Sequence, residues 1–463
     1  MALKKRKTYE LEIIDLAFGG RGIAKPDGFP VFVDRGLPGD VVVAKISKKK
    51  KNFAEAKLVK FIEKSSLRKN ALCRYSGYCG GCKWQELPYE IQLEYKKNHV
   101  AESLKHIGRL ADVPVNDTVP SAKVFGFRNK MEFSCSESRW LMPAELDDPD
   151  AVKGFGIGLH APGTFDRVID IEECLIQPEK GNEILAHVRR FIADSGVPVY
   201  GLRSHEGFWR FLMLRHSVAF DQWMVNIVTS EENSSLLTKL AGELTERFPE
   251  IESVVNNVTA KKAGIAVGDY ETVLAKERCI MEKLGPYTFE ISANSFFQTN
   301  TRAAETLYSI VSDYAALTGT ERVVDLYSGT GTIPIWLSGR AESVMGIEIV
   351  ESAVQDARNN ARINRVENVE FVTGDILDAL PQIQGDVDVM IIDPPRAGMH
   401  KNVVAGVLKA GPDRIVYVSC NPATLSRDLE MLAVQYEVKE VTPVDMFPHT
   451  FHIESVALLE KYR

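Results

Sequence analysis

The feature that most constrains the fold is an alternation of apolar, strand-like runs with helical patterns in the last third of the chain. Five apolar runs each precede a loop and then a helical pattern: residues 323–327, 343–349, 369–373, 387–392 and 414–419. This alternation is typical of a parallel, doubly wound α/β sheet, whose ligands bind at the carboxyl ends of the strands. Two further runs, 436–447 and 454–460, predict a hairpin that closes the sheet.

The first two thirds of the chain follow other patterns. Residues 8–62 read as short strands separated by glycine-rich turns, which is typical of a small barrel of the oligonucleotide-binding kind. A helical pattern at 89–107 is followed by mixed strands and helices, which predict an α+β domain. We therefore expect three domains: a β-barrel over residues 1–63, a central α+β domain over 64–285 and a Rossmann-like domain over 286–463.

Charge is distributed unevenly along the chain. Residues 1–70 hold 17 Lys or Arg against 8 Asp or Glu, although the whole chain has a formal net charge of −7. A basic segment on an acidic protein predicts contact with a polyanion such as nucleic acid. No apolar signal-peptide core follows the basic start, and no run approaches the roughly 18 apolar residues that span a bilayer. We expect a cytoplasmic monomer.

A candidate cofactor pocket follows the first strand of the alternating region. Glycines at 329 and 331 precede a helical pattern, and Glu348 ends the next strand, where a carboxylate can hold ribose hydroxyls. The third glycine of a dinucleotide fingerprint is replaced by Pro334. The layout therefore favours S-adenosylmethionine, which has ribose hydroxyls but no phosphate, over a dinucleotide. Asp375, after the third strand, is placed to meet the adenine amino group.

Two later strand ends carry reactive side chains. Asp393 is followed by two prolines, which predict a rigid, non-helical loop, and Cys420 ends the neighbouring strand. A thiolate that adds to C6 of uracil would make C5 nucleophilic toward a methyl donor, and a carboxylate such as Glu454 would then remove the C5 proton. Methyltransferases of exocyclic amines also use acidic-Pro-Pro loops, but they need no cysteine at this place.

Several motifs together resemble the RNA uracil-C5 methyltransferase family. The resemblance rests on Asn294-Ser-Phe-Phe-Gln298-Thr-Asn300, Asp325-Leu-Tyr327-Ser-Gly-Thr-Gly-Thr332, Asp393-Pro-Pro-Arg-Ala-Gly398, Ser419-Cys420-Asn421-Pro422 and His452-Ile453-Glu454. It implies that Cys420 is the nucleophile and Glu454 the base. It also implies a set of pocket residues that contact S-adenosylmethionine and the uracil: Gln298, Tyr327, Thr332, Glu348, Asp375 and Asp393. Thr332 stands where many family members have Asn.

Four of the seven cysteines have the spacing of a metal site. Cys73, Cys79 and Cys82 are clustered, and Cys174 follows after 91 intervening residues. Four thiolates suit either zinc or an iron-sulfur cluster, and spacing does not separate the two. Family members with this pattern carry a [4Fe-4S] cluster, so the resemblance implies that these four cysteines hold one, with a structural role.

The N-terminal part of the chain indicates which RNA is the substrate. Residues 8–62 resemble a TRAM domain, a small RNA-binding barrel found in front of several RNA-modifying enzymes. Barrel and cluster together resemble the branch of the family that acts on 23S ribosomal RNA, and transfer RNA is the alternative substrate. A catalytically inactive RNA-binding protein is the rival of another class, but intact Cys420 and Glu454 argue against it.

Overall fold

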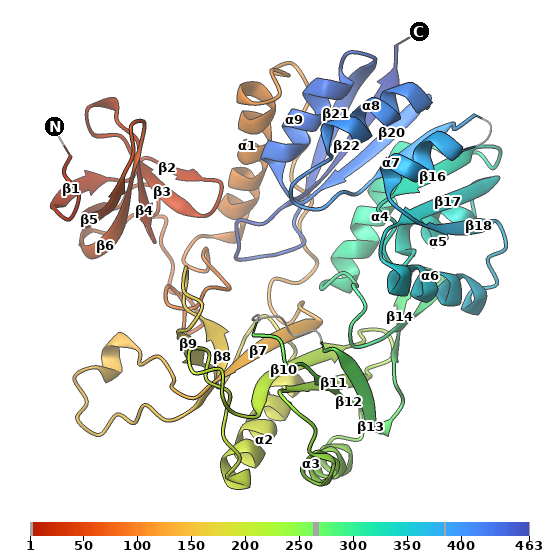
Figure 1. The fold of residues 1–463 in the computed structure, drawn as a ribbon. Helices are drawn as coiled ribbons and strands as arrows, with labels where there is room; N and C mark the ends of the chain where they lie inside the picture. The colour runs from red at the N-terminus through yellow and green to blue at the C-terminus, as the bar shows by residue number, and fades with distance from the viewer. Residues whose placement is uncertain (1–2, 263–267, 384–385, 463) are drawn as a thin grey trace.

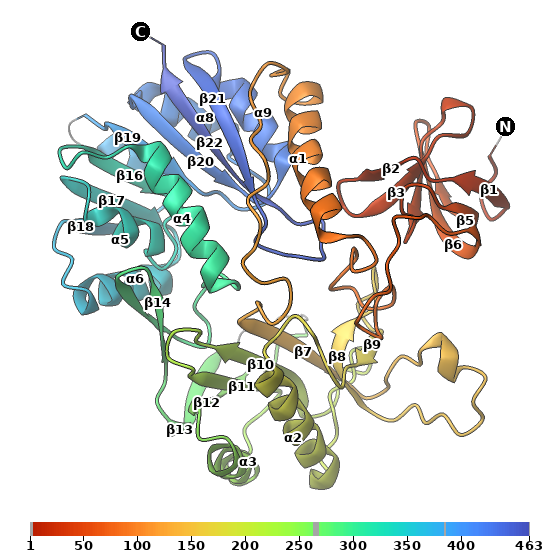
Figure 2. The ribbon, with the colours of Figure 1, turned by 180° about the vertical axis from the view of Figure 1, so that it is seen from behind.

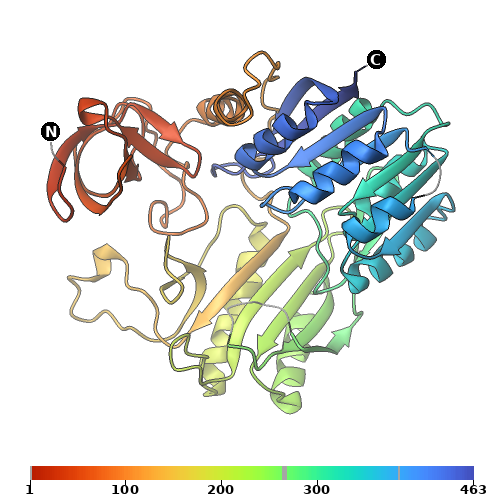
Figure 3. The ribbon, with the colours of Figure 1, turned by 45° about the horizontal axis from the view of Figure 1, so that its top comes forward.

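The N-terminal part is a six-stranded sheet that curls around its own apolar core. The computed structural model describes residues 3–262, 268–383 and 386–462, and the sheet has the order β1-β5-β6-β4-β3-β2. Figure 3 shows its curvature. The elements are β1 (Thr8–Glu12), β2 (Asp15–Ala17), β3 (Arg21–Ala24), the 3-10 helix η1 (Pro26–Gly28), β4 (Val31–Asp34), β5 (Val41–Lys49) and β6 (Ala54–Glu63).

The central part is a mixed seven-stranded sheet, as the α+β pattern predicts, with the order β13-β12-β11-β10-β7-β8-β9. Helices α2 and α3 cover one face (Figure 1) and share an apolar core with the sheet. The elements are β7 (Lys130–Ser136), η2 (Pro143–Glu145), β8 (Gly156–His160), β9 (Val168–Asp170), α2 (Glu179–Ser195), β10 (Trp209–His216), β11 (Trp223–Thr229), α3 (Ser234–Arg247), β12 (Ile251–Val258) and β13 (Tyr270–Lys276).

The C-terminal part is the doubly wound sheet, with the order β18-β17-β16-β19-β20-β22-β21. Strands β16 to β20 are parallel, and the final two strands form the predicted antiparallel hairpin. The strands are β16 (Arg322–Leu326), β17 (Ser343–Glu348), β18 (Val369–Thr373), β19 (Val389–Ile392), β20 (Arg414–Ser419), β21 (Tyr436–Val444) and β22 (Glu454–Lys461), preceded by the hairpin β14 (Ile280–Leu284) and β15 (Tyr287–Ile291).

Helices pack on both faces of this sheet. One face packs against α4 (Thr301–Ala315), α5 (Thr332–Ser338) and α6 (Glu351–Ile363). The other packs against α7 (Ile376–Ala379), η3 (Leu380–Gln382), α8 (Lys401–Ala410) and α9 (Pro422–Leu432). Because the strand order reverses direction at β16 and β19, a crevice opens at their carboxyl ends, where ligands of such sheets bind.

A helix from the front of the chain completes the second face. Helix α1 (Tyr89–His106) packs beside α9 through Val100 and Leu104, as the front and rear views show (Figures 1 and 2). The segment that follows runs along β21, and Val115 and Val119 form parallel bridges to Val441 and Val444. No helix among the described residues is long and apolar enough to cross a membrane.

Polar side chains on α1 hold the loop between β21 and β22. Lys96 and Asp445 are both fully buried, and Nζ lies 2.5 Å from Oδ1. Tyr89 donates its hydroxyl proton to Asp445 Oδ2 at 2.8 Å, and Lys96 also donates to the Phe447 carbonyl at 3.2 Å. Gln92 accepts from the backbone N–H of His449 at 2.9 Å. The loop that leads to Glu454 is therefore fixed from outside the C-terminal domain.

Replacing one member of the buried ion pair is expected to destabilise this part of the protein strongly. Lys96→Met leaves the Asp445 carboxylate buried without its cation, which costs about 3–5 kcal/mol. Denaturant unfolding monitors the change. The control Lys97→Met removes an exposed pair with Asp117 and should leave the unfolding midpoint nearly unchanged. Adding Asp445→Leu to Lys96→Met should restore part of the loss, and a midpoint equal to that of the single variant would contradict the explanation.

Candidate functional site

The predicted site residues gather at one edge of the C-terminal sheet. They lie in or just after β16, β17, β18, β19 and β20, at their carboxyl ends, and at the first residue of β22. The predicted residues so placed are Tyr327, Glu348, Asp375, Asp393, Cys420 and Glu454, and Asp325 in β16, to which the sequence assigned no contact, lies at the same edge. Because β22 is antiparallel to β20, it begins where β20 ends: Ser419 pairs with Ser455. The register therefore brings Cys420 and Glu454 to the same sheet edge.

The glycine-rich loop after β16 is folded around the end of β17. Tyr327 has a φ of 69°, a left-handed conformation that a bulky residue seldom adopts, and its N–H donates to the Ile347 carbonyl at 3.0 Å. Gly329 N–H donates to Glu348 Oε2 at 3.1 Å. Gly331 has a φ of 79°, and a Cβ there would lie 2.6 Å from the Phe371 ring. Glycine is therefore required at 331 for the loop to approach α6 and β18.

Carboxylates at this edge lie close enough to perturb one another. Asp325 is 1% exposed, and burial, Asp393 and Glu348 all raise its pKa well above the ordinary value. Its Oδ1 is buried, and none of the described residues forms a hydrogen bond with it. A buried carboxylate without a cation is costly, so this arrangement suits a positively charged ligand group. The amino group of S-adenosylmethionine is such a group.

Cys420 ends β20 and is half-buried. Burial and the negative charges of Glu454 and Asp393 together raise the pKa of its thiol to about 11, against the opposing effect of Arg396. The next residue, Asn421, caps α9 by accepting the N–H of Ala423 at 3.1 Å, which fixes the chain just after the cysteine. At neutral pH the free thiol is therefore mostly protonated.

Burial raises the pKa values of the two carboxyl groups beside Cys420. Burial raises the pKa of Asp393 to about 7. Glu454 is 8% exposed, and burial together with the charge of Asp393 raises its pKa well above the ordinary value, against the effect of Arg396. A carboxylate with a raised pKa is a stronger base than an exposed one, which suits removal of a weakly acidic carbon-bound proton.

Three predicted cofactor residues make contacts within the protein. The Gln298 carbonyl accepts from Asn129 Nδ2 at 3.0 Å, which ties this segment to the central domain. The hydroxyls of Thr332 and Tyr308 lie 2.9 Å apart. Asp375 caps α7 by accepting the N–H of Leu377 at 2.8 Å. Their contacts with a cofactor remain predictions.

Two residues near the reacting groups were given no role by the sequence. Tyr308 on α4 is buried, and burial together with Asp393, Asp325 and Glu454 raises the pKa of its hydroxyl. No motif marks it, because an apolar helix face predicts only core packing. Arg396 lies inside the Asp393-Pro-Pro motif, and this position close to the acid could have indicated a role for it.

The four predicted metal ligands line one small cavity between the cysteine-rich segment and the loop before α2. Cys73, Cys79, Cys82 and Cys174 all contribute to its wall. Burial raises the pKa of the Cys79 and Cys174 thiols to about 12, so thiolates here require a metal. Gly81 N–H donates to Cys79 Sγ at 3.4 Å, a contact typical of cluster ligands.

The cysteine cavity is not arranged as a single-ion site. Across the described ranges, no three or more His, Cys, Asp or Glu side chains form a group that could hold one metal ion. The metal cluster expected at these four cysteines therefore has no support from this finding and stays a prediction.

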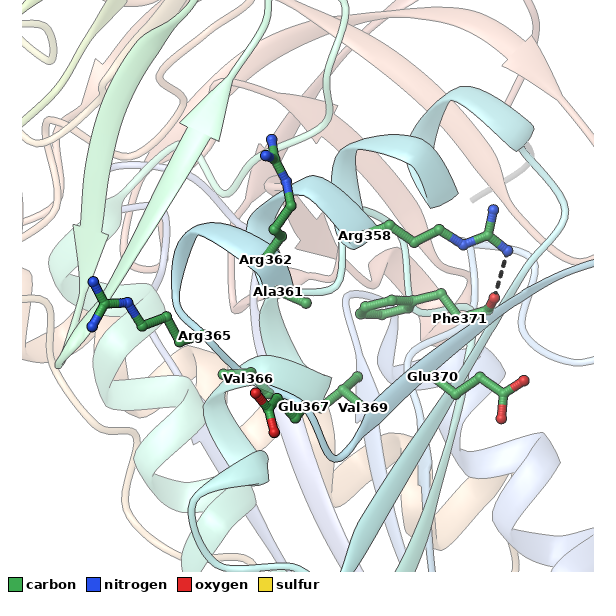
Figure 4. A pocket seen from close by; sticks show the side chains of 9 residues that line it. All are labelled: Arg358, Ala361, Arg362, Arg365, Val366, Glu367, Val369, Glu370 and Phe371. Atoms are coloured by element: carbon green, nitrogen blue, oxygen red, sulfur yellow. Dashed lines mark hydrogen bonds between the residues drawn. The ribbon is translucent and has the colours of Figure 1, made fainter.

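A separate open hollow lies between α6 and β18 (Figure 4). Arg358, Arg362 and Arg365 line it together with Glu367 and Glu370, and Arg358 donates to the Phe371 carbonyl at 2.8 Å. The hollow contains none of the predicted cofactor, catalytic or cysteine residues. Because its lining carries both positive and negative side chains and none of the predicted site residues, we assign the hollow no part in the site.

Comparison with known proteins agrees with the chemistry of this edge. Residues 257–462 match the family model described as tRNA (Uracil-5-)-methyltransferase, and residues 2–59 match the TRAM domain. An uncharacterized RNA methyltransferase of Chlorobaculum tepidum is 41% identical over 99% of this chain and 97% of its own. Another, from Bacteroides thetaiotaomicron, is 42% identical over 96% of this chain and 100% of its own.

A solved structure is similar over almost the entire chain. The Pyrococcus abyssi tRNA (uracil-54, C5)-methyltransferase in complex with S-adenosyl-L-homocysteine has a TM-score of 0.78 and 31% identity. The match covers 97% of this chain and 99% of the other. The resemblance drawn from the motifs is confirmed: the chain belongs to the RNA uracil-5-methyltransferase family, with a TRAM domain at its N-terminus.

Proposed function

We propose that this methyltransferase forms 5-methyluridine in RNA by a covalent mechanism in which Cys420 is the nucleophile and Glu454 the base. The observation that carries the proposal is the convergence of Cys420, Glu454 and Asp393 at the end of the β20-β22 pair. Methylation of an exocyclic amine does not require a thiol beside two carboxyl groups with raised pKa values. It matches what C5 methylation of uracil requires.

The bond changes assign a role to each side chain. The Cys420 sulfur forms a bond to C6, and the C5=C6 electrons move toward C5 and O4. C5 would take the methyl group of S-adenosylmethionine, whose S–CH3 bond breaks with its electrons moving to sulfur and leaves S-adenosylhomocysteine. Glu454 then removes the C5 proton, the C5=C6 bond re-forms, and the C6–S bond breaks with its electrons returning to sulfur. Ionised Asp393 would accept the N3–H of uracil and hold the ring in this orientation.

The chain offers a complete set of cofactor contacts. Glu348 would hold the ribose hydroxyls, Asp375 the adenine amino group, and the unpaired Oδ1 of Asp325 the cofactor's amino group. Gln298, Tyr327 and Thr332 would line the remaining wall. We also propose the domain boundaries 1–63, 64–285 and 286–463, and action as a monomer in the cytoplasm, where RNA substrates are found.

The RNA substrate has two candidates. Resemblance to the barrel-and-cluster branch of the family favours 23S ribosomal RNA. The Pyrococcus abyssi tRNA (uracil-54, C5)-methyltransferase favours transfer RNA, because its match covers 97% of this chain and so includes most of the N-terminal region. The N-terminal domain therefore does not separate the two substrates.

Mapping 5-methyluridine in cells with and without the gene tests the proposed activity. We expect one or more 23S ribosomal RNA positions to lose the methyl group when the gene is deleted, and to regain it with the wild-type gene but not with Cys420→Ala. Loss of 5-methyluridine from transfer RNA alone would identify transfer RNA as the substrate. Unchanged 5-methyluridine in both RNAs would contradict the proposed reaction.

Glu454→Gln is expected to transfer methyl groups but fail to release the RNA, because the C5 proton becomes removable only after C5 is tetrahedral. Turnover should fall about 100-fold or more. A protein-RNA adduct labelled from methyl-labelled cofactor should accumulate toward one per enzyme on denaturing gels. Glu460→Gln, at the far end of the same strand, is the matched control. The double variant Cys420→Ala, Glu454→Gln should form no adduct, and normal turnover of Glu454→Gln would assign the base elsewhere.

We propose further that Cys73, Cys79, Cys82 and Cys174 hold a structural [4Fe-4S] cluster that joins the cysteine-rich segment to the central domain. The support is the shared cavity and the backbone N–H donor to Cys79. No step of the methyl transfer uses a redox centre.

Metal analysis tests the cluster. Protein purified without oxygen should be brown and contain about four irons per chain. Cys174→Ala should lose most of the iron, whereas Cys279→Ala, which changes a cysteine outside the cavity, should retain it. One zinc per chain with no iron would overturn the cluster and leave the methyltransferase assignment intact.

A further inference from the structure

The arrangement around Cys420 leaves one chemical problem unsolved. The thiol must ionise before sulfur can attack C6, yet burial raises its pKa to about 11. The charged groups that face it are Glu454 from β22 and Asp393 from the loop after β19, and both disfavour a second negative charge. A cation beside the sulfur is therefore needed.

Arg396 is the cation that the fold places there. Its positive charge lowers the pKa of the Cys420 thiol, against the effects of burial and of the two carboxylates. Its backbone is tied to the chain that follows Cys420: Asn421 Nδ2 donates to the Arg396 carbonyl at 3.1 Å, and Thr424 Oγ1 donates to it at 3.3 Å. The loop of Asp393 and the loop of Cys420 are thus linked at this residue.

His452 holds the other end of the guanidinium. Its Nδ1 lies 3.4 Å from Arg396 Nη2. Burial, with Arg396, Lys96, Lys83 and Arg128 nearby, lowers the pKa of His452 to about 4. The ring is therefore neutral at pH 7, and an unprotonated Nδ1 accepts a hydrogen bond from the guanidinium. Two contacts keep His452 in place. The ring of Phe451 packs against its ring with 4.2 Å between the centroids, and the backbone N–H of His452 donates to Thr450 Oγ1.

We propose that Arg396 is a further catalytic residue that stabilises the Cys420 thiolate, and that His452 is a positioning residue that orients the Arg396 guanidinium toward the sulfur. The inference rests on the proposed role of Cys420 as nucleophile. The thiol proton leaves to water, Arg396 stays protonated, and the sulfur electron pair then forms the S–C6 bond. Negative charge moves from sulfur to the uracil ring in that step.

The rate of Cys420 alkylation as a function of pH tests this assignment without RNA. Full-length protein is treated with iodoacetamide, and modification of the Cys420 peptide is followed by mass spectrometry. Arg396→Gln should slow alkylation at pH 8 by about tenfold for each unit by which the thiol pKa rises. Arg396→Lys should keep part of the effect, because it retains the charge but not the planar fork.

Variants of His452 test whether this residue orients the Arg396 guanidinium or only stabilises the structure. His452→Ala should shift the alkylation profile in the same direction as Arg396→Gln, and His452→Gln, which retains an acceptor, should return most of the way to wild type. The control Arg362→Gln changes an arginine on α6 outside the site and should match the wild type. Thermal unfolding identifies any variant that has lost its structure, and Arg396→Lys then serves as the deciding variant.

The outcomes separate this inference from the proposed function. Alkylation profiles of Arg396→Gln and Arg396→Lys that superimpose on the wild type would overturn the role of Arg396. If the profile shifts while cells lacking the gene keep all their 5-methyluridine, Arg396 still activates the thiol and the proposed reaction is wrong. If the profile shifts and Arg396→Gln also forms the methylated adduct more slowly, both stand.

Discussion

The buried ion pair between Lys96 and Asp445 is the interaction on which the geometry of the site depends. Two full charges without solvent are stable only when their attraction and additional hydrogen bonds offset the cost of desolvation. Burial lowers the pKa of Lys96, and the Asp445 carboxylate opposes that change. Tyr89 and the Phe447 N–H satisfy the remaining carboxylate positions. A helix from the front of the chain therefore sets the path of the loop that ends at Glu454.

The active-site edge shows the opposite balance of charge. Asp325, Asp393 and Glu454 are acidic, buried and short of cations, so their pKa values all rise. In the proposed reaction, the amino group of the cofactor and the N3–H of uracil would offset part of the cost of burying these carboxylates.

The parts of the fold that depend on local pattern were predictable. The strand that ends at Ser419 and the loop residues Asp393 and Cys420 could be placed together, because carboxyl ends of parallel strands share an edge. Two boundaries were wrong for tertiary reasons. The pattern of residues 9–15 predicts a single strand, but the run divides, since β1 pairs with β5 and β2 pairs with β3. The run predicted to reach Phe447 ends at Val444, because the next residue turns its carboxylate toward Lys96.

Contacts between distant segments could not be predicted, and they connect the RNA-binding front to the chemistry. Phe18, beside the β2-β3 turn, meets the ring of Phe451 edge-on at 5.6 Å, and Lys83 Nζ lies 4.8 Å from the same ring. Phe451 is three residues from Glu454, so the N-terminal domain touches the loop that leads to the proposed base. No intervening element separates the two, although none of the predicted catalytic residues lies in the N-terminal domain.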